Sequence, residues 1–116
     1  MKDLKRKIHY WCSDTMQNKI TGKGVVCAVL DTGITQHPDL VGRIVGWKDC
    51  VQGKKTIYDD NGHGTHVAGI LAGNGKSGRG LYSGMAPEAQ IFAVKVLNQR
   101  GGGKIRDVIN GIRYVL

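Results

Sequence analysis

The sequence predicts an α/β fold in which a parallel sheet is flanked by helices. Two apolar runs, residues 25–30 and 91–97, are typical of strands buried inside a parallel sheet. Segments with helical character follow them, over residues 63–73 and 104–116. Strands and helices that alternate in this way pair in parallel and are joined by right-handed crossovers. The length of 116 residues suits one small domain.

Residues 1–18 are charged and mixed in character, so we interpret them as a lead-in to a unit that spans residues 19–116. The first strand follows a glycine-containing turn, and its unbroken apolar run indicates that both of its faces are buried. A second strand is predicted over residues 42–47. The polar stretch over residues 49–60 then connects this strand to the first helix.

The first helix is predicted over residues 63–73, where polar residues and glycines give way to an apolar run. A glycine-rich loop over residues 74–80 follows, and we expect a loop of this composition to be mobile. The last segment is predicted to be an amphipathic helix because apolar side chains recur in it at steps of three and four. These apolar residues are Ile105, Val108, Ile109, Ile112, Val115 and Leu116.

Two polar residues stand at the ends of predicted elements. Asp31 directly follows the first apolar strand, and open α/β sheets bind ligands at the carboxyl ends of their strands. His63 starts the first helix, where the partial positive charge of the helix end disfavours imidazolium and favours a neutral, proton-accepting ring. An acid that can orient a histidine base makes up two thirds of a nucleophilic triad. His66, further along the helix, is expected to face the core as a hydrogen-bonded histidine.

The two histidines also raise the possibility of a metal site, because Asp59 and Asp60 lie just before them. Their spacing does not match a zincin pattern, and no further block of ligands exists in the sequence. We therefore expect no metal at these residues.

The net charge of +8 comes from 17 basic and 9 acidic residues, a balance that can reflect an anionic partner. The basic residues are scattered without interleaved aromatics, so we expect a solvated surface and no nucleic-acid binding. Cys12, Cys27 and Cys50 form no CxxC pair and fit free thiols in a reducing compartment. No apolar run approaches the ~20 residues of a membrane span, and no signal core follows the N-terminus. A cytoplasmic location is favoured, with secretion as the alternative if the N-terminus is incomplete.

Three sequence blocks occur together, namely Val-Leu-Asp-Thr-Gly-Ile at residues 29–34, Asn-Gly-His-Gly-Thr-His-Val-Ala-Gly at residues 61–69 and Gly-Met-Ala-Pro-Glu-Ala at residues 84–89. In order and spacing they resemble the subtilisin-like serine proteases, or subtilases, from about Lys19 to the C-terminus. The resemblance implies the N-terminal portion of a subtilisin-like catalytic domain. It also implies a serine endopeptidase that cuts peptides or proteins, with His63 as the base and Asp31 as the acid that orients it.

The nucleophilic serine of this family lies in a Gly-Thr-Ser-Met-Ala block, which this chain lacks. Ser13, Ser77 and Ser83 have no such context. We therefore expect the chain to be inactive alone and to need the missing C-terminal half of the domain. One alternative is an inactive remnant, or a module that binds or complements a second polypeptide. A more distant alternative is a basic nucleic-acid-binding domain.

The resemblance further assigns residues that would bind substrate. Leu97 would line the pocket for the substrate residue two before the cut, and Gly101, Gly102 and Gly103 would pair with an extended substrate as an added strand. Asp39 resembles a calcium-binding carboxylate of many subtilases. The loop that would supply the other ligands here contains two cations and no acid, so we expect no cofactor and no calcium at that position.

Overall fold

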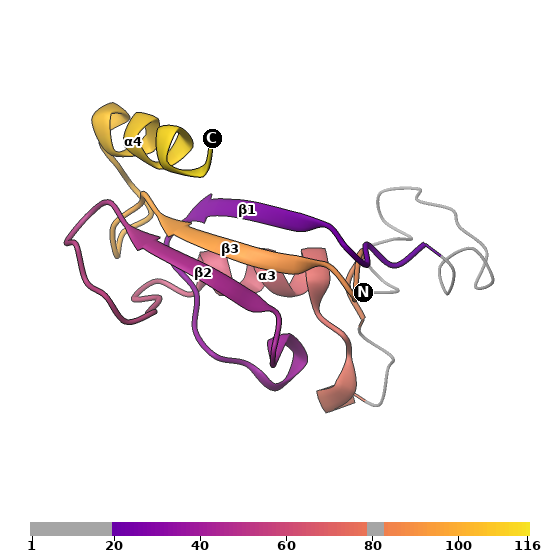
Figure 1. Cartoon of the computed structure of the whole chain (residues 1–116). Coiled ribbons are helices and arrows are strands. Elements are labelled where there is room, and N and C mark those ends of the chain that lie inside the picture. The colour runs from indigo at the N-terminus through magenta and orange to yellow at the C-terminus, as the bar shows by residue number, and fades with distance from the viewer. Residues whose placement is uncertain (1–19, 79–82) are drawn as a thin grey trace, which may run out of the picture.

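A computed structural model describes residues 20–78 and 83–116, so the lead-in predicted over residues 1–18 lies outside the described residues. The regular elements, labelled in Figure 1, are β1 (Val26–Asp31), β2 (Ile44–Asp49), α3 (His63–Ala72), β3 (Gln90–Lys95) and α4 (Ile105–Val115). Two short 3₁₀ helices, η1 (Pro38–Leu40) and η2 (Lys76–Gly78), lie in the connections. The predicted strands and helices are thus present, and their bounds differ from the prediction by at most two residues.

The three strands form one parallel sheet in the order β1-β3-β2, which confirms the predicted fold class. Its register aligns the strand ends, because Asp31 of β1 and Asp49 of β2 both lie opposite Lys95 of β3. All three strands therefore end on a charged residue at the carboxyl edge of the sheet. This is the edge at which α/β proteins place their chemistry.

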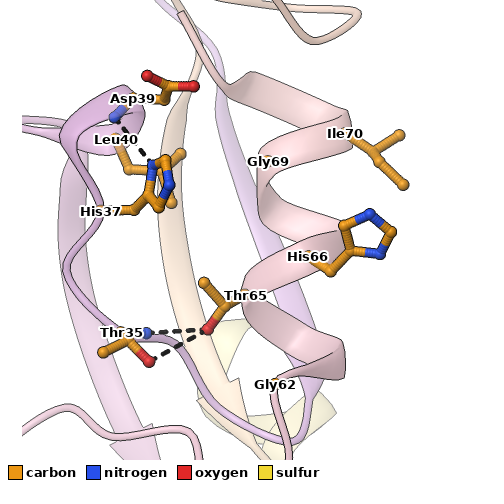
Figure 2. A pocket seen from close by; sticks show the side chains of 9 residues that line it. All are labelled: Thr35, His37, Asp39, Leu40, Gly62, Thr65, His66, Gly69 and Ile70. Atoms are coloured by element: carbon orange, nitrogen blue, oxygen red, sulfur yellow. Dashed lines mark hydrogen bonds between the residues drawn. The ribbon is translucent and has the colours of Figure 1, made fainter. Parts of the chain in front are cut away.

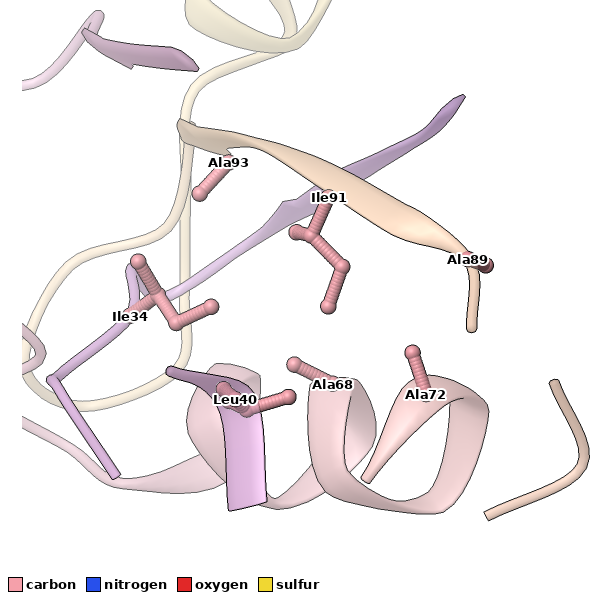
Figure 3. Close-up of a cluster of buried hydrophobic side chains, with 7 residues drawn as sticks. All are labelled: Ile34, Leu40, Ala68, Ala72, Ala89, Ile91 and Ala93. Atoms are coloured by element: carbon pink, nitrogen blue, oxygen red, sulfur yellow. The ribbon is translucent and has the colours of Figure 1, made fainter. Parts of the chain in front are cut away.

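Helix α3 covers one face of the sheet with small side chains (Figures 1 and 3). Gly64, Ala68 and Ala72 recur at steps of four, so they share one side of the helix, and all three are buried. This side faces Ile91 and Ala93 of β3. Small residues let the helix approach the strand closely. The buried cluster comprises Ile34, Leu40, Ala68, Ala72, Ala89, Ile91 and Ala93 (Figure 3).

Helix α4 lies on the opposite face of the sheet (Figure 1). A Cβ atom added at its buried Gly111 would lie 2.6 Å from Val96 and 3.1 Å from Val94, which shows how closely the backbones approach. About one turn further along α4, the Tyr114 ring packs against Phe92 of β3 with ring centroids 5.9 Å apart. Neither helix of the described residues is long and apolar enough to cross a membrane.

The prediction that both faces of β1 are buried is wrong for the described chain. Val26 is 52% exposed and Ala28 is also exposed, because α4 leaves an open apolar groove over this part of the strand. In addition, β1 is an edge strand of the three-stranded sheet, and the central position belongs to β3. An apolar run shows that a strand can be buried, but the elements available to cover it decide whether it is.

The fit of α3 against the turn after β1 can be tested at two glycines of the same helix. A Cβ atom at Gly64 would lie 2.2 Å from the carbonyl oxygen of Gly33, whereas one at Gly69 would meet nothing within 4 Å. We expect Gly64→Ala to lower the free energy of unfolding of the purified protein by about 1–3 kcal/mol through overpacking. Gly69→Ala, the control, should raise it by about 0.5–1 kcal/mol through helix propensity. Equal effects of the two substitutions in chemical denaturation would contradict this packing.

Candidate active site

The structure brings Asp31 and His63 into direct contact. Asp31 is the last residue of β1, and His63 is the first residue of α3. The Nδ1 atom of the His63 ring lies 2.8 Å from Oδ1 and 3.0 Å from Oδ2 of Asp31. The Asp31 carboxylate is buried and also accepts the backbone N–H of Thr32 at 2.7 Å. Because the His63 side chain is 63% exposed, its Nε2 side remains open to a reacting group.

The electrostatics at His63 correct one expectation from the sequence. The hydrogen bond to Asp31 and then the charge of Asp31 raise the pKa of His63 above its ordinary value, and the charge of Asp59 adds to this. The helix start was expected to favour the neutral ring. Instead, the positive helix end is met by the carboxylate of Asp59, which accepts N–H groups of the first turn, and Asp31 stabilises the protonated ring. His63 is therefore a free base only at a higher pH than an isolated histidine.

Asp59 organises the start of α3. Its carboxylate accepts the backbone N–H of Gly62 at 2.8 Å, and both the N–H and the hydroxyl of Thr65 at 2.9 and 2.6 Å. It also accepts the hydroxyl of Thr32 at 2.8 Å, and that hydroxyl in turn accepts the N–H of Gly64 at 2.9 Å. Asp59 thereby ties the first turn of α3 to the residue that follows Asp31.

These hydrogen bonds also favour the ionised form of the Asp59 carboxylate. Burial alone would raise its pKa, but the bonds from Thr65, Gly62 and Thr32 together hold the pKa well below the usual range for aspartate. On the sequence alone, Asp59 is a candidate only as a metal ligand. The sequence feature that could have predicted a helix-capping role is the position of Asp59, an acidic residue a few positions before the start of a helix.

Asn61 connects His63 to residues 97–103, the segment that contains the predicted substrate-binding residues. Its Oδ1 atom accepts the backbone N–H of His63 at 3.0 Å, and its Nδ2 atom donates to the carbonyl oxygen of Gln99 at 2.9 Å. The other end of this segment is also held, because the backbone N–H of Leu97 donates to the carbonyl oxygen of Asp31 at 3.1 Å. The structure therefore places half-buried Leu97 directly beside the Asp31 backbone.

The three predicted glycines follow in an exposed turn. Asn98 closes this turn by donating its backbone N–H to Gly102 at 2.7 Å and accepting that of Gly101 at 2.9 Å. Gly101 has a φ of +80°, a left-handed conformation that favours glycine. Gly101, Gly102 and Gly103 are all exposed, and their binding role stays a prediction.

The prediction that His66 faces the core is wrong. His66 is exposed, because it lies two residues from both Gly64 and Ala68, on the opposite side of a helix that turns those residues inward. A shallow pocket lies between α3 and the η1 loop, and Figure 2 shows His66 beside it. The lining residues are Thr35, His37, Asp39, Leu40, Gly62, Thr65, His66, Gly69 and Ile70.

Asp39 lies at the far end of this pocket and contacts the loop predicted to be mobile. Its carboxylate Oδ1 atom accepts the backbone N–H of Ser77 at 2.8 Å, and its carbonyl oxygen accepts that of Asn74 at 2.9 Å. Partial burial opposes ionisation, but the bonds from Ser77 lower the pKa of Asp39 below its ordinary value. Residues 76–78 form η2, so this part of the predicted loop has regular structure. Residues 79–80 lie outside the described residues.

The fold and the Asp31–His63 pair define an α/β protein with a carboxylate–histidine contact at the carboxyl edge of its parallel sheet. The model of the subtilase family matches residues 22–116. Serine protease AprX of Bacillus subtilis is 55% identical over 97 residues, covering 84% of this chain and 22% of AprX. The minor extracellular protease Epr of the same species is 48% identical over 95 residues, covering 82% of this chain and 14% of Epr.

A solved structure of a cold-adapted subtilisin-like serine proteinase is also similar, with a TM-score of 0.73 and 37% identity. The match covers 83% of this chain and 33% of that structure. The chain belongs to the subtilase family, whose members are serine peptidases. It spans a third or less of the length of these relatives. One of them is named as extracellular, so the comparisons give no support to the favoured cytoplasmic location.

The role of Asp59 predicts a defined response to acid. The pKa of Asp59 in the folded protein lies below its unfolded value of ~3.9. The stabilisation that the ionised Asp59 carboxylate provides is therefore complete above pH ~3.9 and is lost as the pH falls toward the folded-state pKa. Asp59→Asn should lower the free energy of unfolding by about 1–3 kcal/mol at neutral pH and flatten its decline below pH ~4. Asp107→Asn is the control, since Asp107 also lies in a first helical turn but, among the described residues, pairs only with Arg106, at 3.9 Å. Denaturation from pH 2 to pH 7 would contradict the assignment if both variants kept the wild-type slope.

Proposed function

We propose that this chain supplies the acid and the base of a serine endopeptidase site. The observation that carries the proposal is the Asp31–His63 contact of 2.8 Å at the carboxyl edge of a parallel sheet, with the rest of the His63 ring open. Membership of the subtilase family supports the same reading. In this proposal Asp31 holds the Nδ1 side of the ring and stabilises the imidazolium that forms during the reaction.

In the proposed reaction the nucleophile is a serine that does not belong to any of the three sequence blocks found in this chain. That serine attacks the peptide carbonyl, His63 takes its proton at Nε2, and His63 then returns the proton to the leaving amine. The 116 residues match a third or less of each relative compared, which supports a site completed by further polypeptide. The chain alone would therefore be inactive.

The proposed substrate is an extended peptide or protein segment. Gly101, Gly102 and Gly103 carry no side chains that would obstruct it, and they are exposed beside the loop that Asn61 ties to His63. Backbone pairing at such a segment gives affinity with little side-chain selection. Leu97, beside Asp31, would supply the apolar wall for one substrate side chain.

Substitutions in the full-length gene product test this function. We expect His63→Ala to lower the turnover of a peptide substrate on the order of 10⁶-fold and Asp31→Ala on the order of 10⁴-fold. Because Asp31 raises the pKa of His63, the acid limb of activity should lie above the ordinary histidine value of ~6.5 and should move down in Asp31→Asn. His66→Ala is the control, since His66 is exposed and outside the pair.

The same experiment includes the 116-residue chain alone, which should hydrolyse no peptide and should not react with a fluorophosphonate probe. Labelling of Ser13, Ser77 or Ser83 would contradict the missing nucleophile. A full-length product that neither cuts peptides nor reacts with the probe would favour the alternative of an inactive remnant or complementing module.

We also propose that no calcium is needed at Asp39. The Oδ1 atom of its carboxylate accepts the N–H of Ser77, and its carbonyl oxygen accepts that of Asn74, so two of its oxygens already hold the loop. Six to eight oxygen ligands are typical of calcium. No group of three or more acidic, histidine or cysteine side chains suited to a metal occurs in the part of the chain that the structure describes.

Chelation tests this proposal through thermal melting. A chelator should change the melting temperature of the full-length gene product and of its Asp39→Asn variant by the same amount, because Asp39 would hold no metal. Asp39→Asn should melt lower in both conditions, since a neutral amide accepts the Ser77 N–H less strongly. A chelator effect that disappears only in Asp39→Asn would overturn the proposal.

A further inference from the structure

Lys95 is a buried cation at the carboxyl edge of the sheet. It is the last residue of β3, and its side chain is only 1% exposed. The ammonium donates to the carbonyl oxygens of Thr32 at 2.6 Å and Leu97 at 2.8 Å, and to Oδ1 of Asp60 at 2.8 Å. An ammonium has three N–H donors, so each of them has a partner here. The centroid of the Tyr58 ring lies 5.1 Å away and adds a favourable surface for the cation.

The three acceptors belong to the three segments that make up the candidate site. Thr32 directly follows Asp31, and its hydroxyl also holds the start of α3 through Gly64. Asp60 lies in the loop that leads into His63. Leu97 begins the segment that runs to the exposed glycine turn. One ammonium therefore joins the segment of the acid, the segment of the base and the segment predicted to bind substrate.

Stability is a weak reason for a lysine at this position. Burying an ammonium is costly, and well-packed apolar residues often replace a buried ion pair without loss of stability. Asp60 is one third exposed, at 33%, whereas Lys95 is almost completely buried, so most of the desolvation falls on the lysine. What an apolar side chain could not do is bind three oxygens from separate segments at fixed distances.

We propose that Lys95 is a positioning residue for the Asp31–His63 pair. It acts through the backbone of Thr32 and the side chain of Asp60, and its N–H donors are occupied by those groups and by Leu97. Its effect on turnover rests on the proposed function, but its effect on the His63 ring does not. A displacement of reacting groups by about 1 Å can cost on the order of 10²-fold in rate. Loss of the three hydrogen bonds of the Lys95 ammonium should therefore have a measurable effect on turnover.

The sign of the change in the His63 pKa separates three roles of Lys95. Asp31 and Asp59 both raise this pKa in the wild type. If Lys95 positions the pair, Lys95→Met weakens the Asp31–His63 hydrogen bond, and the pKa falls toward ~6.5. If Lys95 acts only by its charge, removal of that charge raises the pKa. If Lys95 only supports the fold, stability falls while the pKa and the turnover stay unchanged.

The experiment uses NMR titration of the imidazole protons in the full-length gene product, with the His63 signal assigned from His63→Gln. Peptide hydrolysis measures kcat and KM in parallel. We expect Lys95→Met to lower the His63 pKa and to lower kcat about 10- to 100-fold with a smaller change in KM. Lys48→Met is the matched control, because Lys48 is exposed and its ammonium lies over the Tyr114 ring of α4 at 5.0 Å, on the face of the sheet away from α3, so both readouts should be unchanged.

A raised or unchanged His63 pKa in folded Lys95→Met would overturn the proposal. If that variant does not fold, Asp60→Glu decides, since it keeps the negative charge, moves the carboxylate by one methylene and alters a partly exposed residue. A lower His63 pKa in Asp60→Glu supports the proposal, and an unchanged one overturns it. If the wild type cuts no peptide, the proposed function fails, yet the titration still tests the positioning role.

Discussion

The close approach of the start of α3 to the end of β1 is the constraint on which the site depends. Gly64 lies so near the Gly33 carbonyl oxygen that no side chain fits between them. Only at this distance can the His63 ring reach the Asp31 carboxylate at 2.8 Å. A helix start would otherwise be a poor place for a positively charged ring, and the two aspartates that face it, Asp31 and Asp59, reverse that preference.

The carboxyl edge of the sheet is held together by charged groups that are each satisfied. Asp49 ends β2 and accepts the backbone N–H groups of Val51 and Gln52 together with the hydroxyl of Tyr58 at 2.6 Å. Lys95 lies opposite both Asp49 and Asp31 in the register. Within the described residues, no buried side-chain nitrogen or oxygen lacks a partner. Such a network fixes geometry more than it adds stability, which suits an edge that presents reactive groups.

One face of the sheet is only partly covered in the described residues. The face of β1 toward α4 leaves Val26 half-exposed in an apolar groove. The proposed function likewise requires a serine in a Gly-Thr-Ser-Met-Ala block, which is not found in these 116 residues. Both observations agree with a match to a third or less of each relative compared. The described segment nevertheless holds Asp31 and His63 in contact by its own hydrogen bonds, through Asp59 and Thr32.

The sequence alone determined the strands, the two helices and the positions of Asp31 and His63, because periodicity and strand ends are local properties of the chain. The tertiary structure decided the outward direction of His66, the exposure of β1 and the raised pKa of His63. It also assigned partners to Asp59 and Lys95, whose bonds to Thr32 span 27 and 63 positions. These features arise from contacts between distant segments, so no local pattern of residue types could specify which donor would meet which acceptor.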